Sequence, residues 1–375
     1  MRREPSRRAA VRSRLTALCA AALVGALAVS ATASAVGTPT AGARGSVAAR
    51  TPAGTNPLAN RAWGVYTGSG EQSWTPYLRA HGRKKQLLAK IALAPKAKWY
   101  GQWIPANQIT AKVQDHIRIA QAGDPEALVQ MTVFRLKPWE DEACRRLPTA
   151  KEQRDFKKWI DRFAAGIGDA HVALVLQPDG PFALCAPHGS QLPSQLVGYA
   201  AHELSALPNV SVYIDAGASD WLRDDPAKAV QILAPAGIDT ARGFALNSTH
   251  YVSTSAEIEF GTAVVQALAA AGYADKHFVV NTAANGAPFN GYDYRGPNFD
   301  NAATCRTKGQ QACVTLGIPP TADVANPAWG LSTADQAAAA AYVDGYLWIG
   351  RPWLYMQSDP FDLKRALAVA RTTPY

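Results

Sequence analysis

Short apolar runs alternate with longer segments of helical periodicity along most of this chain. Eight runs have the length and side-chain composition of buried strands: 62–66, 98–101, 128–134, 172–177, 210–215, 243–247, 277–281 and 345–349. Strands that alternate with helices in this way form a mostly parallel sheet covered by helices. We therefore predict an α/β protein with a parallel β/α barrel, and an open sheet is the alternative. In both architectures, ligands bind at the carboxyl ends of the strands.

The clearest helical pattern lies at 149–167, where six apolar side chains share one face. Thr149 and Glu152 form a capping box at its start. Two further helices are expected at about 254–271 and 361–370. The stretch 284–335 is long, rich in Pro, Gly and Asn, and contains two cysteines. A loop this long in a compact domain is usually functional, and a surface excursion pinned by a disulfide is the alternative.

The N-terminus has the pattern of a secretory signal peptide. Six Arg residues lie within the first 14 positions, an apolar run follows at 15–29, and Ala33-Ser34-Ala35 is a small-residue cleavage site. An uncleaved membrane anchor is the alternative. The next segment, 36–55, is rich in Ala, Gly, Thr and Pro and predicts a linker or a disordered lead-in. We therefore expect a signal peptide at 1–35, a single domain at 56–375 and a secreted, extracellular protein free of the membrane after cleavage.

Charge and cysteine content narrow the range of partners. The formal net charge is +9, but the first 35 residues carry six Arg and one Glu, so about +4 is left on the mature chain. A charge this weak and scattered does not indicate a nucleic-acid partner. Four of the five cysteines follow the signal peptide and predict two disulfides in an exported protein. No Cys or His spacing is typical of a zinc site, so we expect no metal and no cofactor. We also expect the protein to be a monomer.

Three carboxylates lie at or just beyond the ends of expected strands: Asp141, Asp179 and Asp215. In a parallel barrel, all three would lie at the same mouth. Glycoside hydrolysis uses one carboxylic acid to protonate the leaving oxygen and, in inverting enzymes, a second group to activate water. Neighbouring negative charge and partial burial raise the pKa of such an acid. Capping of the following helix is the alternative for each aspartate.

Four segments, taken together, resemble glycoside hydrolase family 6, the family of inverting cellulases. They are VALVLQPD at 172–179, YIDAGASDW at 213–221, RGFALNSTHY at 242–251 and DGYLWIGRP at 344–352. Their order and spacing are similar to those of the family from about residue 99 to the C-terminus. The resemblance implies a distorted, TIM-like barrel that acts on β-1,4-glucan, such as cellulose, or on a related polysaccharide or oligosaccharide.

The resemblance also implies roles for individual residues. Asp179 corresponds to the general acid, Asp141 to the aspartate that raises the pKa of the acid, and Asp215 to a supporting carboxylate. The implied substrate-binding residues are Trp99, Trp221, Asn247 and Trp348. Core packing is the alternative for Trp99 and Trp221. The implied disulfide pairs are Cys144 with Cys185 and Cys305 with Cys313.

The chain departs from the family where the catalytic base is expected. The positions of the family's Lys, Glu and Asp are occupied by Gly350, Leu354 and Met356. Asp359 lies three residues further on, where it is either the base or the cap of the last helix. Insertion around Asp141 also leaves Glu140 or Glu142 as alternatives for its role. These departures motivate a second hypothesis beside the hydrolase, a non-catalytic glycan-binding protein on the same barrel.

Overall fold

The computed structural model describes residues 55–296 and 298–375, apart from the side chains of Glu140, Asp141 and Asp359. The expected signal peptide at 1–35 and positions 36–54 of the expected lead-in lie outside the described residues. None of the helices in the described part combines the length and the apolar composition needed to cross a membrane.

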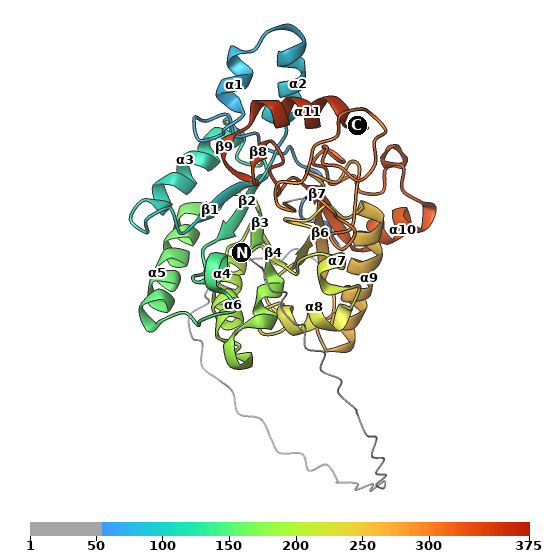
Figure 1. Cartoon of the computed structure of the whole chain (residues 1–375). Helices are drawn as coiled ribbons and strands as arrows, with labels where there is room; N and C mark the ends of the chain where they lie inside the picture. Colours follow the sequence, from blue (N-terminus) through green and yellow to red (C-terminus); the bar gives the residue numbers. More distant parts are fainter. Residues whose placement is uncertain (1–54, 297) are drawn as a thin grey trace, which may run out of the picture. The chain divides into compact units, whose positions relative to one another are not determined.

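Seven parallel strands form one curled sheet in which each strand pairs with the next along the chain (Figure 1). They are β1 (Lys98–Gly101), β2 (Val129–Phe134), β3 (Val172–Leu176), β4 (Val210–Asp215), β5 (Gly243–Leu246), β6 (His277–Asn281) and β7 (Val343–Leu347). The two edges meet just outside β1 and β7, where Ala97 N donates to Trp348 O at 2.9 Å. The prediction of a parallel α/β barrel is therefore confirmed, and the barrel is distorted, as the family resemblance implied.

The prediction of an eighth strand at 62–66 is wrong. This segment makes only a single-residue parallel bridge, from Trp63 to Leu128. Gly64 then passes so close to helix α3 (Ile109–Gln121) that a Cβ on it would lie 2.6 Å from Ala120 O. The chain has to leave the sheet there, because the helix occupies the space into which a strand side chain would point.

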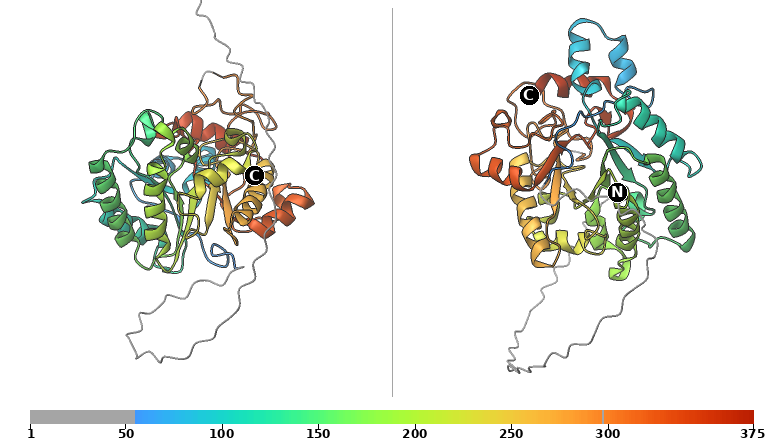
Figure 2. Two further views of the ribbon diagram at one scale, coloured as in Figure 1. Left: turned by 90° about the horizontal axis from the view of Figure 1, so that it is seen from below. Right: turned by 180° about the vertical axis from the view of Figure 1, so that it is seen from behind.

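Helices cover the outside of the sheet. Beside α3 these are α5 (Ala150–Ile167), α6 (Leu192–Ser205), α8 (Pro226–Leu233), α9 (Thr254–Ala270) and α10 (Thr333–Tyr342). Seen from behind, α3 and α5 form one flank and α9 and α10 the other (Figure 2). The helices α1 (Trp74–Arg79), α2 (Gly82–Ala92) and α11 (Leu363–Thr372) lie together at one end (Figure 1).

Local sequence signals set the ends of these helices. The expected capping box is present at the start of α5, where Thr149 and Glu152 exchange side-chain and backbone hydrogen bonds. Ser253 caps α9 by accepting from Ala256 N. The last helix begins after Asp362, whose side chain accepts from Arg365 N. The expectation that Asp359 caps this helix is therefore wrong, and Asp359 lies instead in β9 (Ser358–Phe361), opposite β8 (Leu354–Tyr355).

The strands are buried on both faces, as in other parallel barrels. Outward side chains such as Met131 and Leu174 pack against the helices. Inward side chains such as Val175, Tyr213 and Val279 fill the barrel. The interior is thus a packed core, which leaves the two ends of the barrel as places for polar chemistry.

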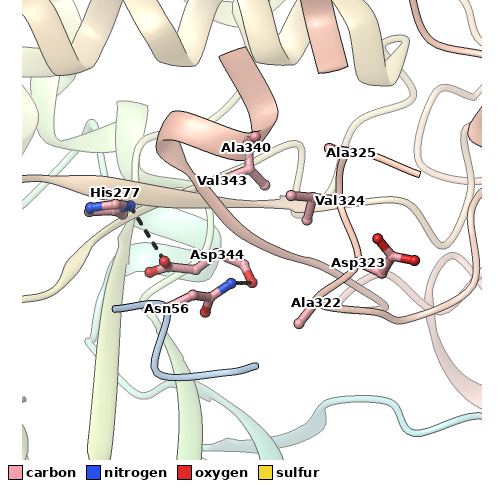
Figure 3. Close-up of a pocket in the computed structure, with 9 residues that line it drawn as sticks. All are labelled: Asn56, His277, Ala322, Asp323, Val324, Ala325, Ala340, Val343 and Asp344. Carbon is pink, nitrogen blue, oxygen red and sulfur yellow. Dashed lines mark hydrogen bonds and ion pairs between the residues drawn. The ribbon is translucent and has the colours of Figure 1, made fainter. Parts of the chain in front are cut away.

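The end formed by the amino termini of the strands holds a closed polar cluster around Asp344. Its buried carboxylate accepts from Arg242 Nε and Nη2 at 2.8 and 2.9 Å and from Tyr213 Oη at 2.7 Å. His277 Nδ1 lies 3.4 Å from the same carboxylate, at the edge of a cavity of about 250 Å³ (Figure 3). Since Arg242 and Tyr213 already satisfy this carboxylate, the cluster is suited to stabilising the barrel.

Two disulfides join the pairs that the family resemblance implied, Cys144–Cys185 and Cys305–Cys313. The first ties the residues after α4 (Trp139–Glu142) to the end of the 3-10 helix η1 (Gly180–Cys185). The second closes a short loop within the long excursion at 284–335, where both sulfur atoms are buried beside Ala287.

Candidate active site

A tight reversal after β3 presents Asp179 at the carboxyl ends of the strands. Gln177 and Asp179 have φ angles of 55° and 67°, in the left-handed region that is uncommon outside glycine. The side chain of Gln177 fixes the reversal, because its Oε1 accepts from Arg135 N and Leu136 N at 3.2 and 3.0 Å. The backbone carbonyl of Asp179 accepts from Trp139 Nε1 at 3.2 Å. Strain held in this way is common at functional sites.

Asp215, at the end of β4, lies directly beside this reversal. Its Oδ1 accepts from Gly180 N at 3.0 Å and from Gly217 N at 2.9 Å, and its Oδ2 accepts from Ser248 Oγ. Position 180 has to be glycine, because a Cβ there would lie 2.0 Å from Asp215 O. The sequence therefore brings the ends of β3 and β4 into direct contact.

Burial raises the pKa of Asp215 to about 7, against the opposing effect of its three hydrogen bonds. The negative charge of Asp179 contributes to the same rise. A buried carboxyl group with a pKa near neutral pH, next to a second carboxyl group, is suited to general acid–base catalysis.

The four residues that follow β5 connect the polar groups of the site. Asn247 turns the chain with a φ of 66°. Ser248 then donates to Asp215, Thr249 Oγ1 donates to Asp179 Oδ1 at 2.8 Å, and His250 Nδ1 pairs with Asp220 at 2.7 Å. The sequence analysis missed Ser248, Thr249 and Asp220, because each acts through a partner 30 or more residues away in the chain.

The resemblance implied that Asn247 faces a substrate, but the structure shows that it does not. It is fully buried. Its amide donates to Val252 O and Asn281 O, both at 3.1 Å, and its Oδ1 accepts from Val252 N at 3.1 Å. With these contacts its side chain holds the 247–252 turn, and it acts on the site only by positioning Ser248 and Thr249.

Trp348 is also misplaced by the sequence prediction. Its side chain is 2% exposed, its Nε1 donates to Ile318 O at 2.9 Å, and its ring packs near Trp353. Leu347 and Ile349 point into the barrel, so Trp348 between them points outward. A substrate in the mouth of the barrel therefore does not reach it.

Trp99 lies inside the mouth and is half-buried. Its Nε1 donates to Ile349 O at 2.8 Å, and Phe134 packs against it with ring centroids 5.9 Å apart. The guanidinium of Arg351 lies over the Trp99 ring, 4.5 Å from its centroid. One face of the Trp99 ring, which was expected to bind a sugar, is thus covered by the Arg351 guanidinium. Only the rest of the ring is available to a sugar.

Trp221 lies on the short helix α7 (Ser219–Leu222), next to a cavity of about 350 Å³. His250 stacks on its ring, with centroids 4.9 Å apart and an interplanar angle of 16°. Phe182 meets it edge to face at 5.4 Å. Behind α7, burial raises the pKa of Glu257 to about 8, although Ser219 N and Oγ donate to it.

The segment expected to carry the base forms a β-hairpin. Met356 and Gln357 form its two-residue turn, with φ angles of 48° and 56° that are typical of a type I′ turn. A Cβ on Gly350 would lie 3.0 Å from Gln357 Oε1. Gln357 Nε2 donates to Thr249 O at 3.3 Å. An amide therefore occupies the space beside Gly350, and the backbone of Asp359 follows it in β9.

Asp141 lies on α4, and its side chain is outside the described part of the chain. The alternative residue Glu142 is an exposed partner of Arg146, with Oε2 at 2.7 Å from Arg146 Nε. This ion pair turns Glu142 toward Arg146 and the start of α5, where Arg146 also pairs with Glu152 at 2.8 Å. Glu142 is thus engaged elsewhere, and Asp141 stays the candidate for the neighbour of the acid, with Glu140, whose side chain is also outside the described part, as the alternative.

The fold and the paired carboxyl groups are those of a β/α barrel with a candidate acid at the ends of its strands. Residues 64–332 match the family described as "Glycosyl hydrolases family 6". Because the match covers more than half of the chain, this protein belongs to that family.

Several relatives carry names that describe cellulases. The chain is 33% identical over 231 residues to endoglucanase A of Cellulomonas fimi, covering 61% of this chain and 48% of the relative. It is 29% identical over 257 residues to endoglucanase 1 of Streptomyces halstedii, covering 67% of this chain and 77% of the relative. The chain thus spans about half the length of the Cellulomonas protein.

One solved structure with a similar fold is the endoglucanase Cel6 from Mycobacterium tuberculosis in complex with methyl-cellobiosyl-4-deoxy-4-thio-β-D-cellobioside. The TM-score is 0.67 at 26% identity, over 84% of this chain and 98% of the other. The enzyme from Orpinomyces sp. Y102 shares the fold at 18% identity, with a TM-score of 0.64.

Proposed function

We propose that this protein is a glycoside hydrolase that cleaves β-1,4-glucan or a related polysaccharide with inversion of the anomeric carbon, with Asp179 as the general acid. The observation that carries the proposal is the position of Asp179, at the end of β3 and beside the buried Asp215. Membership of family 6 and the names of its relatives support a cellulose-like substrate.

The contacts around Asp179 suit proton donation. Thr249 donates to Oδ1 and so holds the orientation of the carboxyl group that is to protonate the leaving oxygen. When the pair shares one proton and Asp179 holds it, Asp215 is ionised. The charge of Asp215 then lies close to the positive charge that develops on the sugar ring in the transition state.

The water that attacks the anomeric carbon must lose its proton to a base. The hairpin places an amide, Gln357, beside Gly350. We therefore assign the base to a carboxylate reached through a chain of water, with Asp359 as the candidate. Asp141 is the candidate neighbour that raises the pKa of the acid.

Replacement of Asp179 tests the proposal directly. Asp179→Asn should lower the release of reducing sugar from a soluble cellulose derivative by roughly 10²–10⁴-fold, the contribution of one general acid. Asp239→Asn is the control, because Asp239 is exposed and lies shortly before the amino end of β5, whereas Asp179 follows the carboxyl end of β3. Fresh product from a β-linked substrate should have the α-configuration by NMR. Unchanged activity in Asp179→Asn would remove the assignment, and a β-product would remove inversion.

The second candidate is a glycan-binding protein without catalysis. It is motivated by the hairpin that replaces the base segment and by the residues Gly350, Leu354 and Met356 at the positions where the family has polar groups. It predicts binding on a glycan array and no hydrolysis after long incubation. Turnover that depends on Asp179 would exclude it.

We also propose that the protein is exported as a monomer after cleavage near Ala35. The arginine-rich start, the apolar run at 15–29 and the two disulfides support export. Mass spectrometry of protein recovered from the culture medium should find an N-terminus close to position 36. Retention in the cell membrane at full length would contradict export, and a dimer by sedimentation would contradict the monomer.

A further inference from the structure

An excess of positive charge lies in and around the first two helices. From Gln72 to Gln114 the chain has eight Lys and Arg residues and no Asp or Glu. The rest of residues 56–375 has 22 Lys and Arg against 28 Asp and Glu, so the remainder of the domain is acidic. The small net charge of the mature chain therefore hides a strong separation of charge along the sequence.

Four of these cations lie where α1 meets α2. Arg79 ends α1, and Arg83, Lys84 and Lys85 follow in the first turn of α2. We call these four residues the basic corner. Arg79, Arg83 and Lys84 are exposed and Lys85 is half-buried, and the two helices project from one end of the domain (Figure 1). None of the ion pairs formed by the described residues includes a member of the corner.

Other lysines of the same stretch are used within the protein. Lys96 is buried and lies 3.6 Å from Glu71, and Lys98 Nζ lies 4.1 Å from the centroid of the Tyr66 ring. These contacts explain two of the cations as parts of the domain. The cations of the basic corner have no such explanation.

Helix stability does not account for the corner either. The helices α5, α9 and α10 each begin with a Thr or Ser cap and carry an acidic residue in the first turn. In contrast, α2 begins after His81, whose side chain makes no capping hydrogen bond, and its first turn holds three cations and no acidic residue. Cations at this end of a helix oppose its dipole and lower its stability. Their position is therefore better explained by a partner than by the fold.

The surroundings of the corner indicate the kind of partner. The apolar side chains of α2, among them Leu87, Leu88 and Ile91, are buried in the core, so this helix has no apolar face left to enter a lipid bilayer. By contrast, α1 has no buried residue, and its Trp74 and Tyr77 rings lie 5.5 Å apart beside the cations. The flat faces of such rings suit the apolar CH faces of sugars.

We propose that the basic corner, together with Trp74, binds an anionic polysaccharide that carries carboxylate or sulfate ester groups on its sugars. The guanidinium groups of Arg79 and Arg83 match the paired oxygens of such groups. Membership of a glycoside hydrolase family favours a polysaccharide as the polyanion. The proposal does not depend on the proposed function, because the corner belongs to α1 and α2 and the candidate acid follows β3.

Binding to immobilised polymers tests the proposal. Biolayer interferometry should show binding to polygalacturonate, which carries carboxylates, or to dextran sulfate, which carries sulfate esters, and none to neutral dextran. Joint replacement of Arg83, Lys84 and Lys85 by Gln should raise the Kd about tenfold, the sum of three exposed charge pairs. The melting temperature of this variant should stay the same or rise, because cations are removed from the start of a helix. A loss of binding therefore cannot come from unfolding.

The matched control replaces Arg154, Lys157 and Lys158 of α5 by Gln. These three side chains are also exposed, the change in net charge is the same, and Lys157 Nζ lies 4.8 Å from the Tyr199 centroid, as Lys85 Nζ lies 5.1 Å from that of Tyr77. This variant should bind the polymers as the unsubstituted protein does. An equal loss in both triple variants would overturn the proposal, because the total charge alone would then decide binding.

Trp74→Ala tests whether sugars are recognised. It should weaken binding to the charged polysaccharide roughly 2–10-fold, the range of aromatic contacts. Binding to poly-L-glutamate, a polyanion without sugar rings, should not change. An equal loss for poly-L-glutamate would overturn the role of the sugar. Binding to neither charged polysaccharide would overturn the whole proposal, as would tighter binding to vesicles of phosphatidylglycerol and phosphatidylcholine or to a single-stranded oligonucleotide.

Discussion

The two halves of the barrel mouth are built in different ways. Around the acid, β3, β4 and β5 end in residues that bond directly to one another, and Asp215 receives two backbone N–H groups and a hydroxyl. On the other side, beyond β7, a hairpin brings Gln357 next to Gly350, and Arg351 covers Trp99. The first half holds carboxyl groups rigidly, and the second has Gly350, Leu354 and Met356 at the positions where the family has Lys, Glu and Asp. Under the proposed function, the side that donates the proton has kept the family's carboxyl groups, whereas the side that accepts it has changed. Proton donation and proton acceptance can therefore diverge separately within one barrel.

The largest effect is expected from Asp215→Asn, which removes one member of the carboxyl pair. We expect kcat to fall about 100-fold, at the lower end of the contribution of one acid–base group. The alkaline limb of the pH profile should also move. In the unsubstituted protein, Asp215 loses its proton as the pH rises through its pKa of about 7, and we expect activity to fall over the same range.

Because Asp215→Asn removes the group that titrates near pH 7, the alkaline limb should no longer lie near that pH in this variant. Profiles of kcat/KM against pH on a soluble cellulose derivative measure both effects. Ser248→Ala is the companion variant, because it keeps both carboxyl groups and removes only the hydroxyl that bonds to Asp215. An alkaline limb that stays in place would show that Asp215 does not set the pH dependence of activity.

Asp359→Asn probes the other half of the mouth. If water relays the proton to Asp359, we expect kcat to fall roughly tenfold, less than for a first-contact acid or base. Single-turnover kinetics should place the loss in the chemical step and leave KM unchanged. Asp239→Asn serves again as the exposed control. An effect as large as that of Asp179→Asn would mean that the base is as directly placed as the acid, and the contrast between the halves would disappear.

Burial of the Glu257 carboxyl group near Asp179 should lower the free energy of unfolding by an amount that depends on pH. Glu257 is fully buried, and its pKa of about 8 lies above its ordinary value of 4.5. The folded state therefore holds more protons than the unfolded state between these values, so stability is full below about pH 4.5 and is lost as the pH rises toward 8.

Glu257→Gln should remove this dependence of the unfolding free energy on pH, which is at most about 1.4 kcal/mol per pH unit. Glutamine keeps an acceptor for Ser219 N, so the fold should persist. Urea unfolding at a series of pH values gives the slope directly. Glu203→Gln, at an exposed position on α6, is the control. The same slope in Glu257→Gln as in the unsubstituted protein would assign the pH dependence to other groups.

The contrast between the halves also decides what the sequence could predict. Strand periodicity located seven strands, and the family resemblance gave both disulfide pairs. Trp348 was misplaced because the resemblance gave only its place in the chain, whereas the alternation of side chains turns it away from the mouth of the barrel. Thr249 and Asp220 carry no local signal, since their partners lie 70 and 30 residues away in the chain. The hairpin turn at Met356 and Gln357 was missed because neither residue is Gly, Asn or Asp, the usual residues for such a turn.

Thr249 is the residue that touches both halves, and it provides the finest test. Its side chain donates to Asp179, whereas its carbonyl accepts from Gln357 across the mouth. Thr249→Val keeps the shape and the carbonyl but removes the donor, so kcat should fall about 3–10-fold, the value of one typical hydrogen bond. Thr249→Ser should restore it. Gln357→Ala removes only the contact from the hairpin and should change kcat less than Thr249→Val does. The reverse order would mean that the hairpin, rather than the turn after β5, sets the position of the acid, and the two halves would then work as one unit.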